Sequence, residues 1–266
     1  MHIVNSPAAT AAAARPRLTW FTFASPANFY RLAGVLGPLC GAVAAAFAVA
    51  GLWMGFFVAP TDAVQGEVYR IIFIHVPAAW LSMVLYVAMA FWAALGWLLN
   101  ARMAFIFARA IAPTGALFTL LALWTGSLWG RPTWGVYWTW DARLTSTALL
   151  FLLYLGYLVV RRLPADTEVR NRRSAFVALL AFVDVPIVYY SVSWWRSLHQ
   201  TATLSINTHI HGLMLFTLML SMVVFLLAYV WMLTHRFRLA WLEEEIETQG
   251  LELAITERRA EAEVSA

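Results

Sequence analysis

The sequence has 266 residues, contains no lysine, and carries a charge on only 12% of its residues. A soluble domain has about 25% charged residues. All 18 basic residues are arginines, and they gather at the ends of apolar segments, as the positive-inside rule describes for membrane proteins. The net charge of +4 therefore does not indicate a nucleic-acid partner. With 62% hydrophobic residues, the sequence predicts an integral membrane protein surrounded by lipid.

Cysteine is almost absent, since Cys40 is the only one and lies in an apolar segment. This excludes an intramolecular disulfide and a cysteine-based metal or redox site. A glycine-rich nucleotide-binding loop is also missing, so the chain is not expected to hydrolyse ATP itself. Near the N-terminus the arginines follow an alanine-rich run instead of preceding it, and no cleavable signal is expected.

What the chain does contain is long hydrophobic segments. A hydrocarbon core of about 30 Å requires roughly 20 helical residues. Six segments meet this length, near 33–57, 72–98, 105–128, 146–162, 175–193 and 210–234. We therefore expect an all-α membrane protein, with a tail at 1–31, a six-helix domain at 32–235 and a second tail at 236–266. The second tail is expected to be an exposed helix that frays near Gly250 and whose charges are solvated.

The distribution of arginine predicts the orientation. Arginines are concentrated before the first segment, in the second and fourth connections and after the sixth segment. Both termini are thus predicted to be cytoplasmic, with loops 58–71, 129–145 and 194–209 facing outward. These loops nevertheless carry Arg70, Arg131, Arg143 and Arg196, which suggests an anionic ligand on that side.

The loop between the third and fourth segments is unusually rich in tryptophan. Trp134, Tyr137, Trp138 and Trp140 lie within seven residues, more aromatic surface than an interfacial belt requires. We expect these rings to form a flat shelf. Asp141 and Arg143 follow directly in the sequence. They are expected either to pair with each other and shape the loop, or to offer charge to a ligand on the shelf.

Four of the six histidines lie on the predicted outer side. His75 falls just inside the second segment, where Pro77 is expected to loosen the helix, and His199 follows an aromatic pair. A single intramembrane histidine is about as often a hydrogen-bonded core residue as a ligand. His209 and His211 are two residues apart and point in different directions, so they cannot chelate one ion together.

We interpret His209 and His211 as interfacial residues, near a helix cap at Asn207 or Thr208. Asp184 lies in the middle of the fifth segment, where an unpaired carboxylate is costly. Because no second buried acid or histidine follows at helical spacing, a hydrogen bond between packed helices is favoured over a proton relay.

Two imidazoles on separate outer segments, a broad aromatic surface and nearby arginines together fit a haem. Haem iron takes axial histidine ligands, and its propionates pair with arginine. A bare metal ion requires three or four ligands close together. A quinone fits the aromatic surface but does not require two histidines.

The run from Trp134 to Asp141 resembles the tryptophan-rich WWD signature of the haem-handling proteins of cytochrome c biogenesis. Within that superfamily, four segments are similar to the CcmC family: His75 to Ala79, Gly126 to Pro132, Asp141 to Ser146 and Trp194 to Gln200. The resemblance covers residues from about 30 to 235. Tyr137 and Asp184 depart from the family's usual pattern.

The resemblance implies that the protein binds haem b at the periplasmic face and promotes its covalent transfer to the haem chaperone CcmE. It also implies that His75 and His199 are axial ligands, that the tryptophan-rich loop is a platform, and that CcmA, CcmB and CcmD are partners. Such a protein is a haem transfer or attachment factor and no classical hydrolase.

Three alternatives remain. A complete cytochrome c haem lyase of the same superfamily has more spans and a further histidine pair. A b-type haem electron carrier is expected to hold its histidine pair within the bundle. A transporter that carries haem through itself is compatible with the sequence.

Overall fold

The computed structural model describes residues 25–199 and 210–264, a range in which every regular element is helical. Six helical segments in this range are long and apolar enough to cross a membrane. They are Pro26–Val58, Glu67–Leu99, Arg102–Trp134, Ala142–Arg162, Thr167–Trp194 and Gly212–Gly250. The expectation of an all-α, six-span, multi-pass membrane protein is confirmed. The expected absence of a signal concerns residues 1–24, which lie outside the described residues.

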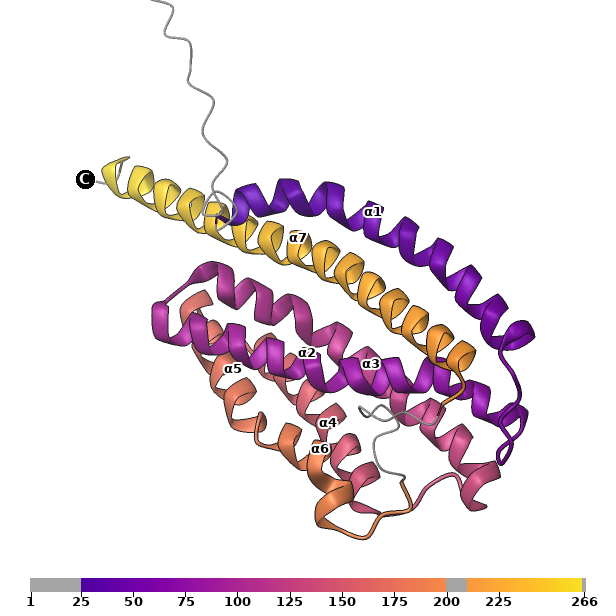
Figure 1. The fold of residues 1–266 in the computed structure, drawn as a ribbon. Coiled ribbons are helices and arrows are strands. Elements are labelled where there is room, and N and C mark those ends of the chain that lie inside the picture. Colours follow the sequence, from indigo (N-terminus) through magenta and orange to yellow (C-terminus); the bar gives the residue numbers. More distant parts are fainter. Residues whose placement is uncertain (1–24, 200–209, 265–266) are drawn as a thin grey trace, which may run out of the picture.

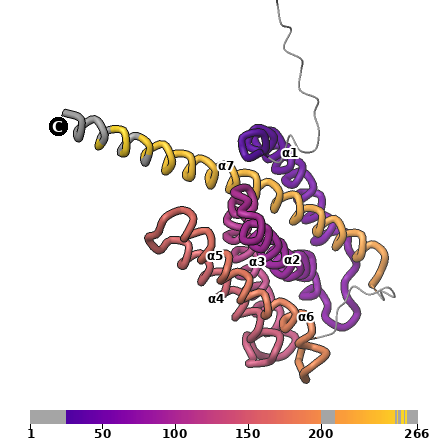
Figure 2. Tube along the Cα trace, turned by 90° about the vertical axis from the view of Figure 1, so that its left-hand side faces the viewer, coloured from indigo at the N-terminus to yellow at the C-terminus, as the bar shows by residue number. Residues whose placement is uncertain are grey.

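The helices pack in three layers (Figure 1). One layer is the pair α1 (Pro26–Trp53) and α7 (Gly212–Val264), and the central layer is the hairpin of α2 (Ile72–Leu99) and α3 (Arg102–Trp134). The third layer contains α4 (Ala142–Arg162), α5 (Thr167–Ala181) and α6 (Asp184–Trp194). The same order is visible from the side in Figure 2. The beginning of α1 and the end of α7 lie at the same end of the bundle.

The central and third layers are joined by a buried tyrosine. Tyr154 on α4 is fully buried and donates a hydrogen bond from its hydroxyl to the backbone carbonyl of Ser82 on α2, at 2.9 Å. Its ring passes directly over Gly115 of α3, where a β-carbon would collide with it. Glycine at position 115 therefore leaves room for the Tyr154 ring to cross α3. The hydrogen bond from this ring to Ser82 then fixes the position of α4 relative to α2.

The fifth span is broken, in contrast to the continuous helix predicted at 175–193. The helix α5 ends at Ala181 and α6 begins at Asp184. The cause is Pro186, which has no N–H to donate and whose ring collides with the carbonyl four residues earlier, that of Phe182. Asp184, the first residue after the break, is buried. Neither of its carboxylate oxygens accepts a hydrogen bond from a described residue. The predicted packing hydrogen bond of Asp184 is wrong.

The predicted second tail is part of the last helix. The helix α7 passes residue 236 without a break and continues to Val264, so the predicted fraying near Gly250 is wrong. Its charges are also not merely solvated, since Glu243, Glu244, Glu245 and Glu247 pair with arginines of α3 and α5.

The tryptophan-rich connection is shorter than the predicted loop 129–145. The helix α3 continues to Trp134 and ends at Gly135, whose φ of 81° is a left-handed conformation that favours glycine. Arg131 is therefore a helical residue. The helix α4 begins after Asp141, so the connection contains only residues 135–141. Pro77, expected to loosen its helix, lies within α2 without ending it.

Candidate functional site

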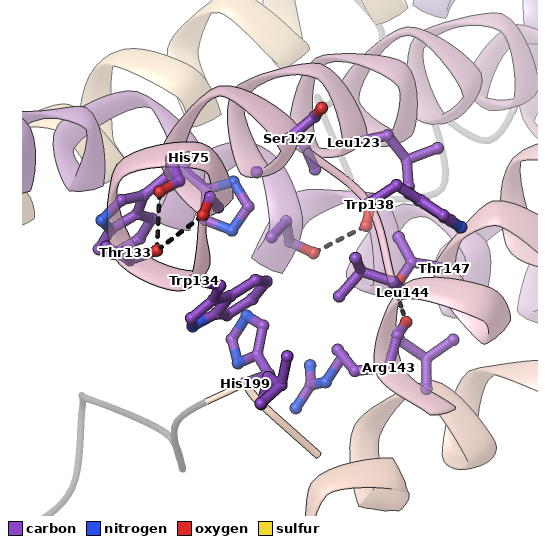
Figure 3. A pocket seen from close by; sticks show the side chains of 18 of the residues that line it. His75, Leu123, Ser127, Thr133, Trp134, Trp138, Arg143, Leu144, Thr147 and His199 are labelled. Carbon is purple, nitrogen blue, oxygen red and sulfur yellow. Dashed lines mark hydrogen bonds between the residues drawn. The ribbon is translucent and has the colours of Figure 1, made fainter. Parts of the chain in front are cut away.

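A cavity opens at the end of the bundle where α2 and α4 begin and α3 ends. One face each of α2, α3 and α4 lines it, together with the segment that follows α6 (Figure 3). Its polar and aromatic side chains are Gln65, His75, Ser127, Trp129, Thr133, Trp134, Trp138, Arg143, Thr147 and His199.

Five of the residues singled out from the sequence lie together on this cavity: His75, Trp134, Trp138, Arg143 and His199. They come from segments as far apart in the chain as α2 and the residues beyond α6. In Figure 3 the ring of Trp134 lies between the two imidazoles. The structure thus brings both candidate histidines to one cavity.

His75 is held by three features of α3. Its Nδ1 lies 3.0 Å from the hydroxyl of Thr125, and its ring meets the ring of Trp129 edge-on at 5.5 Å between centroids. A β-carbon on Gly126 would lie 2.9 Å from His75 Cε1, which is closer than real β-carbons approach other atoms. Glycine at position 126 therefore allows the imidazole to lie directly against the helix.

His199 is positioned through its own backbone. Its N–H donates to the hydroxyl of Ser197 at 3.0 Å, and that hydroxyl donates to the Oδ2 atom of Asp141. The ring of His199 also packs at 6.2 Å from that of Trp134. The segment that carries His199 is thereby tied to the beginning of α4.

Asp141 has a second role as the N-cap of α4, where its Oδ1 accepts a hydrogen bond from Leu144 N–H at 2.8 Å. Such a cap contributes about 1 kcal/mol to helix stability. Asp141 and Arg143 do not form an ion pair within 4 Å, so the hypothesis that they pair to shape the loop is wrong. Asp141 shapes the loop through Leu144 and Ser197 instead.

Arg143 lines the cavity, and one nitrogen of its guanidinium group has no hydrogen-bond partner in the described protein. Its Nε is buried and has no hydrogen-bond acceptor among residues 25–199 and 210–264. Figure 3 shows the guanidinium pointing into the cavity toward His199. A buried donor without an acceptor is destabilising, so this guanidinium group is a candidate to bind an anionic ligand.

The aromatic rings do not form the flat shelf that the sequence suggested. The rings of Trp138 and Trp140 are nearly perpendicular, with an interplanar angle of 84°. Trp138 lines the cavity, whereas Trp140 is 83% exposed and lines a separate outer groove. Tyr137 is also exposed. The cavity wall is instead built by Trp129, Trp134 and Trp138 from two segments.

Three arginines predicted near a ligand have other contacts. Arg70 pairs with Glu67 and donates to the carbonyls of Gly55 and Ala59, so it braces the connection between the first two spans. Arg131 donates to the carbonyl of Gly135 and lies 5.7 Å from the centre of the Tyr137 ring. Arg196 lines the outer groove beside Trp140 and Asp141. These three arginines do not line the cavity.

Sequence reasoning missed several residues of the site. Gln65 accepts a hydrogen bond from the indole Nε1 of Trp129 at 2.7 Å, and both line the cavity. Thr125 and Gly126 support His75 but carry no chemical signature of their own. Helical spacing could have found Gly126, because Gly126, Gly130 and Trp134 recur every four residues on one face of α3. It gives no signal for Gln65 or Thr125.

The remaining histidines have separate positions. His211 is exposed, and its Nδ1 accepts from Leu213 N–H at 3.3 Å while its carbonyl accepts from Leu215 N–H. It therefore caps α7, which begins at Gly212, whereas the predicted cap residues Asn207 and Thr208 lie outside the described residues. His209 lies outside the described residues.

Comparison with known proteins identifies the family. The family model described as heme exporter protein C, CcmC, matches residues 19–252. The chain belongs to this family. A heme exporter protein C from Haemophilus influenzae is 37% identical over 225 residues, covering 84% of this chain and 92% of the relative. The protein of that name from Escherichia coli is 41% identical over 185 residues, covering 70% of this chain and 76% of the relative.

A third relative comes from a plant. A ccmC-like mitochondrial protein of Marchantia polymorpha, named for cytochrome c biosynthesis, is 44% identical over 170 residues. The alignment covers 64% of this chain and 72% of the relative. The family match over residues 19–252 includes the six spans and the residues that line the cavity.

The ligand-binding groups of the cavity suit a haem. Within the described residues, no cluster of three or more histidine, cysteine or acidic side chains could hold a bare ion. The cavity instead offers two imidazoles, aromatic walls and a buried guanidinium nitrogen without an acceptor. A haem matches this set, because its ring supplies four of the iron ligands and its propionates accept hydrogen bonds.

Proposed function

We propose that this protein holds haem b in the cavity between α2, α3 and α4 and passes it covalently to a CcmE-type haem chaperone during maturation of c-type cytochromes. The observation that carries the proposal is the convergence of His75, His199 and Arg143 on one cavity. The names of its relatives, heme exporter protein C and a cytochrome c biosynthesis protein, point to the same activity.

The distribution of arginine supports a periplasmic site. Arg102, Arg109, Arg161, Arg162 and Arg236 all lie toward the end of the bundle opposite the cavity. Because arginine accumulates on the cytoplasmic side, the cavity opens toward the periplasm of a bacterial inner membrane and both termini are cytoplasmic.

Each group of the cavity has a distinct role. His75 and His199 would hold the haem iron through their imidazole nitrogens, and Trp129, Trp134 and Trp138 would pack against the apolar ring. Arg143 would donate to a propionate and so select the orientation of the haem. When bound, the haem supplies the iron and two carboxylates that these side chains recognise. Asp141 acts on the site by holding Ser197 and the segment of His199.

The outer surface around the cavity suits a partner. Trp140 and Leu198 are exposed large hydrophobic residues of the outer groove, and the exposed Trp194 and Trp195 directly precede Arg196 of that groove in the chain. We assign them to contact with the chaperone. The ATP-driven subunits CcmA and CcmB, with the small protein CcmD, supply the energy for release that this chain has no motif to provide.

The proposal is tested by purifying the protein with and without a CcmE-type partner and recording the haem spectrum of each. We expect bound b-type haem, which becomes covalently attached to the partner when both are present. His75→Ala and His199→Ala are each expected to lose axial ligation and chaperone loading, and added imidazole should restore the spectrum.

Two outcomes distinguish other functions. Attachment of haem directly to an apocytochrome would show a lyase. Reversible electron transfer without any covalent product would show a b-type electron carrier. If both histidine variants kept an unchanged haem spectrum and full loading, the ligand assignment would be wrong.

A further inference from the structure

The buried hydroxyl of Thr125 lies behind the cavity and contacts His75, and the proposed roles do not use it. Thr125 lies on α3, is 5% exposed, and faces His75 across the gap between α2 and α3. Its Oγ1 lies 2.6 Å from the backbone carbonyl of Leu121 and 3.0 Å from His75 Nδ1. Both distances are within hydrogen-bonding range.

A threonine hydroxyl has one proton to donate and two lone pairs to accept with. The carbonyl of Leu121 can only accept, so the short contact with it requires the hydroxyl proton. The hydroxyl then has only lone pairs to offer His75. The contact with His75 must therefore be donated by the imidazole, from an Nδ1–H group.

An Nδ1–H group fixes the tautomer of a neutral imidazole, because the other nitrogen, Nε2, then carries the lone pair. The position of Gly126 agrees with this orientation. A β-carbon at Gly126 would lie 3.5 Å from Nδ1 and 3.9 Å from Nε2, so Nε2 is the nitrogen farther from α3. His75 lines the cavity, and in this tautomer Nε2 carries the lone pair that can coordinate a metal.

We propose that Thr125 is a positioning residue that holds His75 as the Nδ1–H tautomer, so that Nε2 is presented to the iron of a haem. The assignment rests on the proposed function for the identity of the ligand. The tautomer itself follows from the protein's own contacts and is measurable without haem. Hydrogen bonds to the second nitrogen of a metal-binding histidine typically change metal affinity 10–100-fold.

The matched variants are Thr125→Val, which keeps the shape of the side chain and removes the hydroxyl, and Thr125→Ser, which keeps the hydroxyl. Thr119→Val is the control. Thr119 is also buried on α3 and also donates to a carbonyl one turn earlier, that of Gly115 at 2.7 Å, but it does not line the cavity. It reports the loss of a buried hydroxyl without the loss of a contact to His75.

The first measurement is made without haem, on full-length protein labelled with ¹⁵N-histidine in detergent. Two-bond ¹H–¹⁵N correlations identify the protonated nitrogen, and His75→Ala assigns the signal. We expect Nδ1–H for His75 in the parent protein, in Thr125→Ser and in Thr119→Val, and a mixture of tautomers in Thr125→Val. An Nε2–H form in the parent protein would overturn the assignment, even if every variant bound haem.

The second measurement titrates the same proteins with haem and follows the absorption spectrum. Thr125→Val should bind haem about 10–100-fold more weakly and show partial loss of the six-coordinate spectrum. Thr125→Ser and Thr119→Val should resemble the parent. Unchanged affinity and spectrum in Thr125→Val would refute the positioning role. If the tautomers behave as expected but His75→Ala binds haem normally, the proposed function fails and the tautomer assignment stands.

Discussion

Replacing Arg143 separates binding of an anion from stability of the fold. The Nε of Arg143 is buried without an acceptor, so the side chain contributes little to stability before a ligand binds. Arg143→Met keeps much of the length of the side chain and removes the charge. We expect the ligand-free protein to unfold at the same or a higher temperature, because a buried unpaired charge has been removed.

The same substitution should weaken haem binding. A hydrogen bond to a charged group contributes about 1.5–3 kcal/mol. Since each 1.4 kcal/mol is a factor of ten in affinity, the loss should be about 10- to 150-fold. Arg143→Lys keeps the charge but not the planar fork of donors, so its haem affinity should lie between those of the parent and Arg143→Met.

The assay combines haem titration of the detergent-solubilised protein with thermal unfolding followed by circular dichroism. Arg196→Met is the matched control, since Arg196 lines the outer groove and not the cavity, and its haem affinity should match the parent. Exchanging Asp141 and Arg143 is a poorer test, because Asp141 also caps α4 and holds Ser197. The propionate assignment is refuted if Arg143→Met binds haem as tightly as the parent.

Two further pairs of substitutions test the geometry of the site. Gly126→Ala should displace the imidazole of His75 and reduce axial ligation, as a haem spectrum would show, because the new β-carbon meets Cε1 at 2.9 Å. Gly156→Ala on α4 meets nothing within 4 Å and should instead raise stability by about 1 kcal/mol in thermal unfolding. Trp138→Ala should lower haem affinity, whereas Trp140→Ala should leave it unchanged and reduce capture of the chaperone. Equal haem affinities for the two tryptophan variants would contradict the separation of cavity and outer groove.

Patterns along the chain predicted the membrane spans because they are local. Each span requires a continuous run of apolar residues, and such a run is visible without knowledge of its neighbours. The break in the fifth span was also present in the sequence, as Pro186, since the collision of its ring with the carbonyl of Phe182 is a local effect. The continuation of α7 past Gly250 was not predicted, because glycine lowers helix stability without preventing a helix. Ion pairs with Arg102, Arg109 and Arg170 anchor the turns of α7 that precede Gly250.

The composition and motifs by themselves determined the membrane class, the six spans, the family resemblance and the candidates His75, His199 and Arg143. Tertiary structure decided which candidates share a cavity. It placed Trp138 inside and Trp140 outside, brought Ser197 to Asp141, and set Thr125 against His75. These roles depend on contacts between helices distant in sequence and on the direction of each side chain. A one-dimensional pattern fixes neither, because residues only two apart can face opposite sides of the chain.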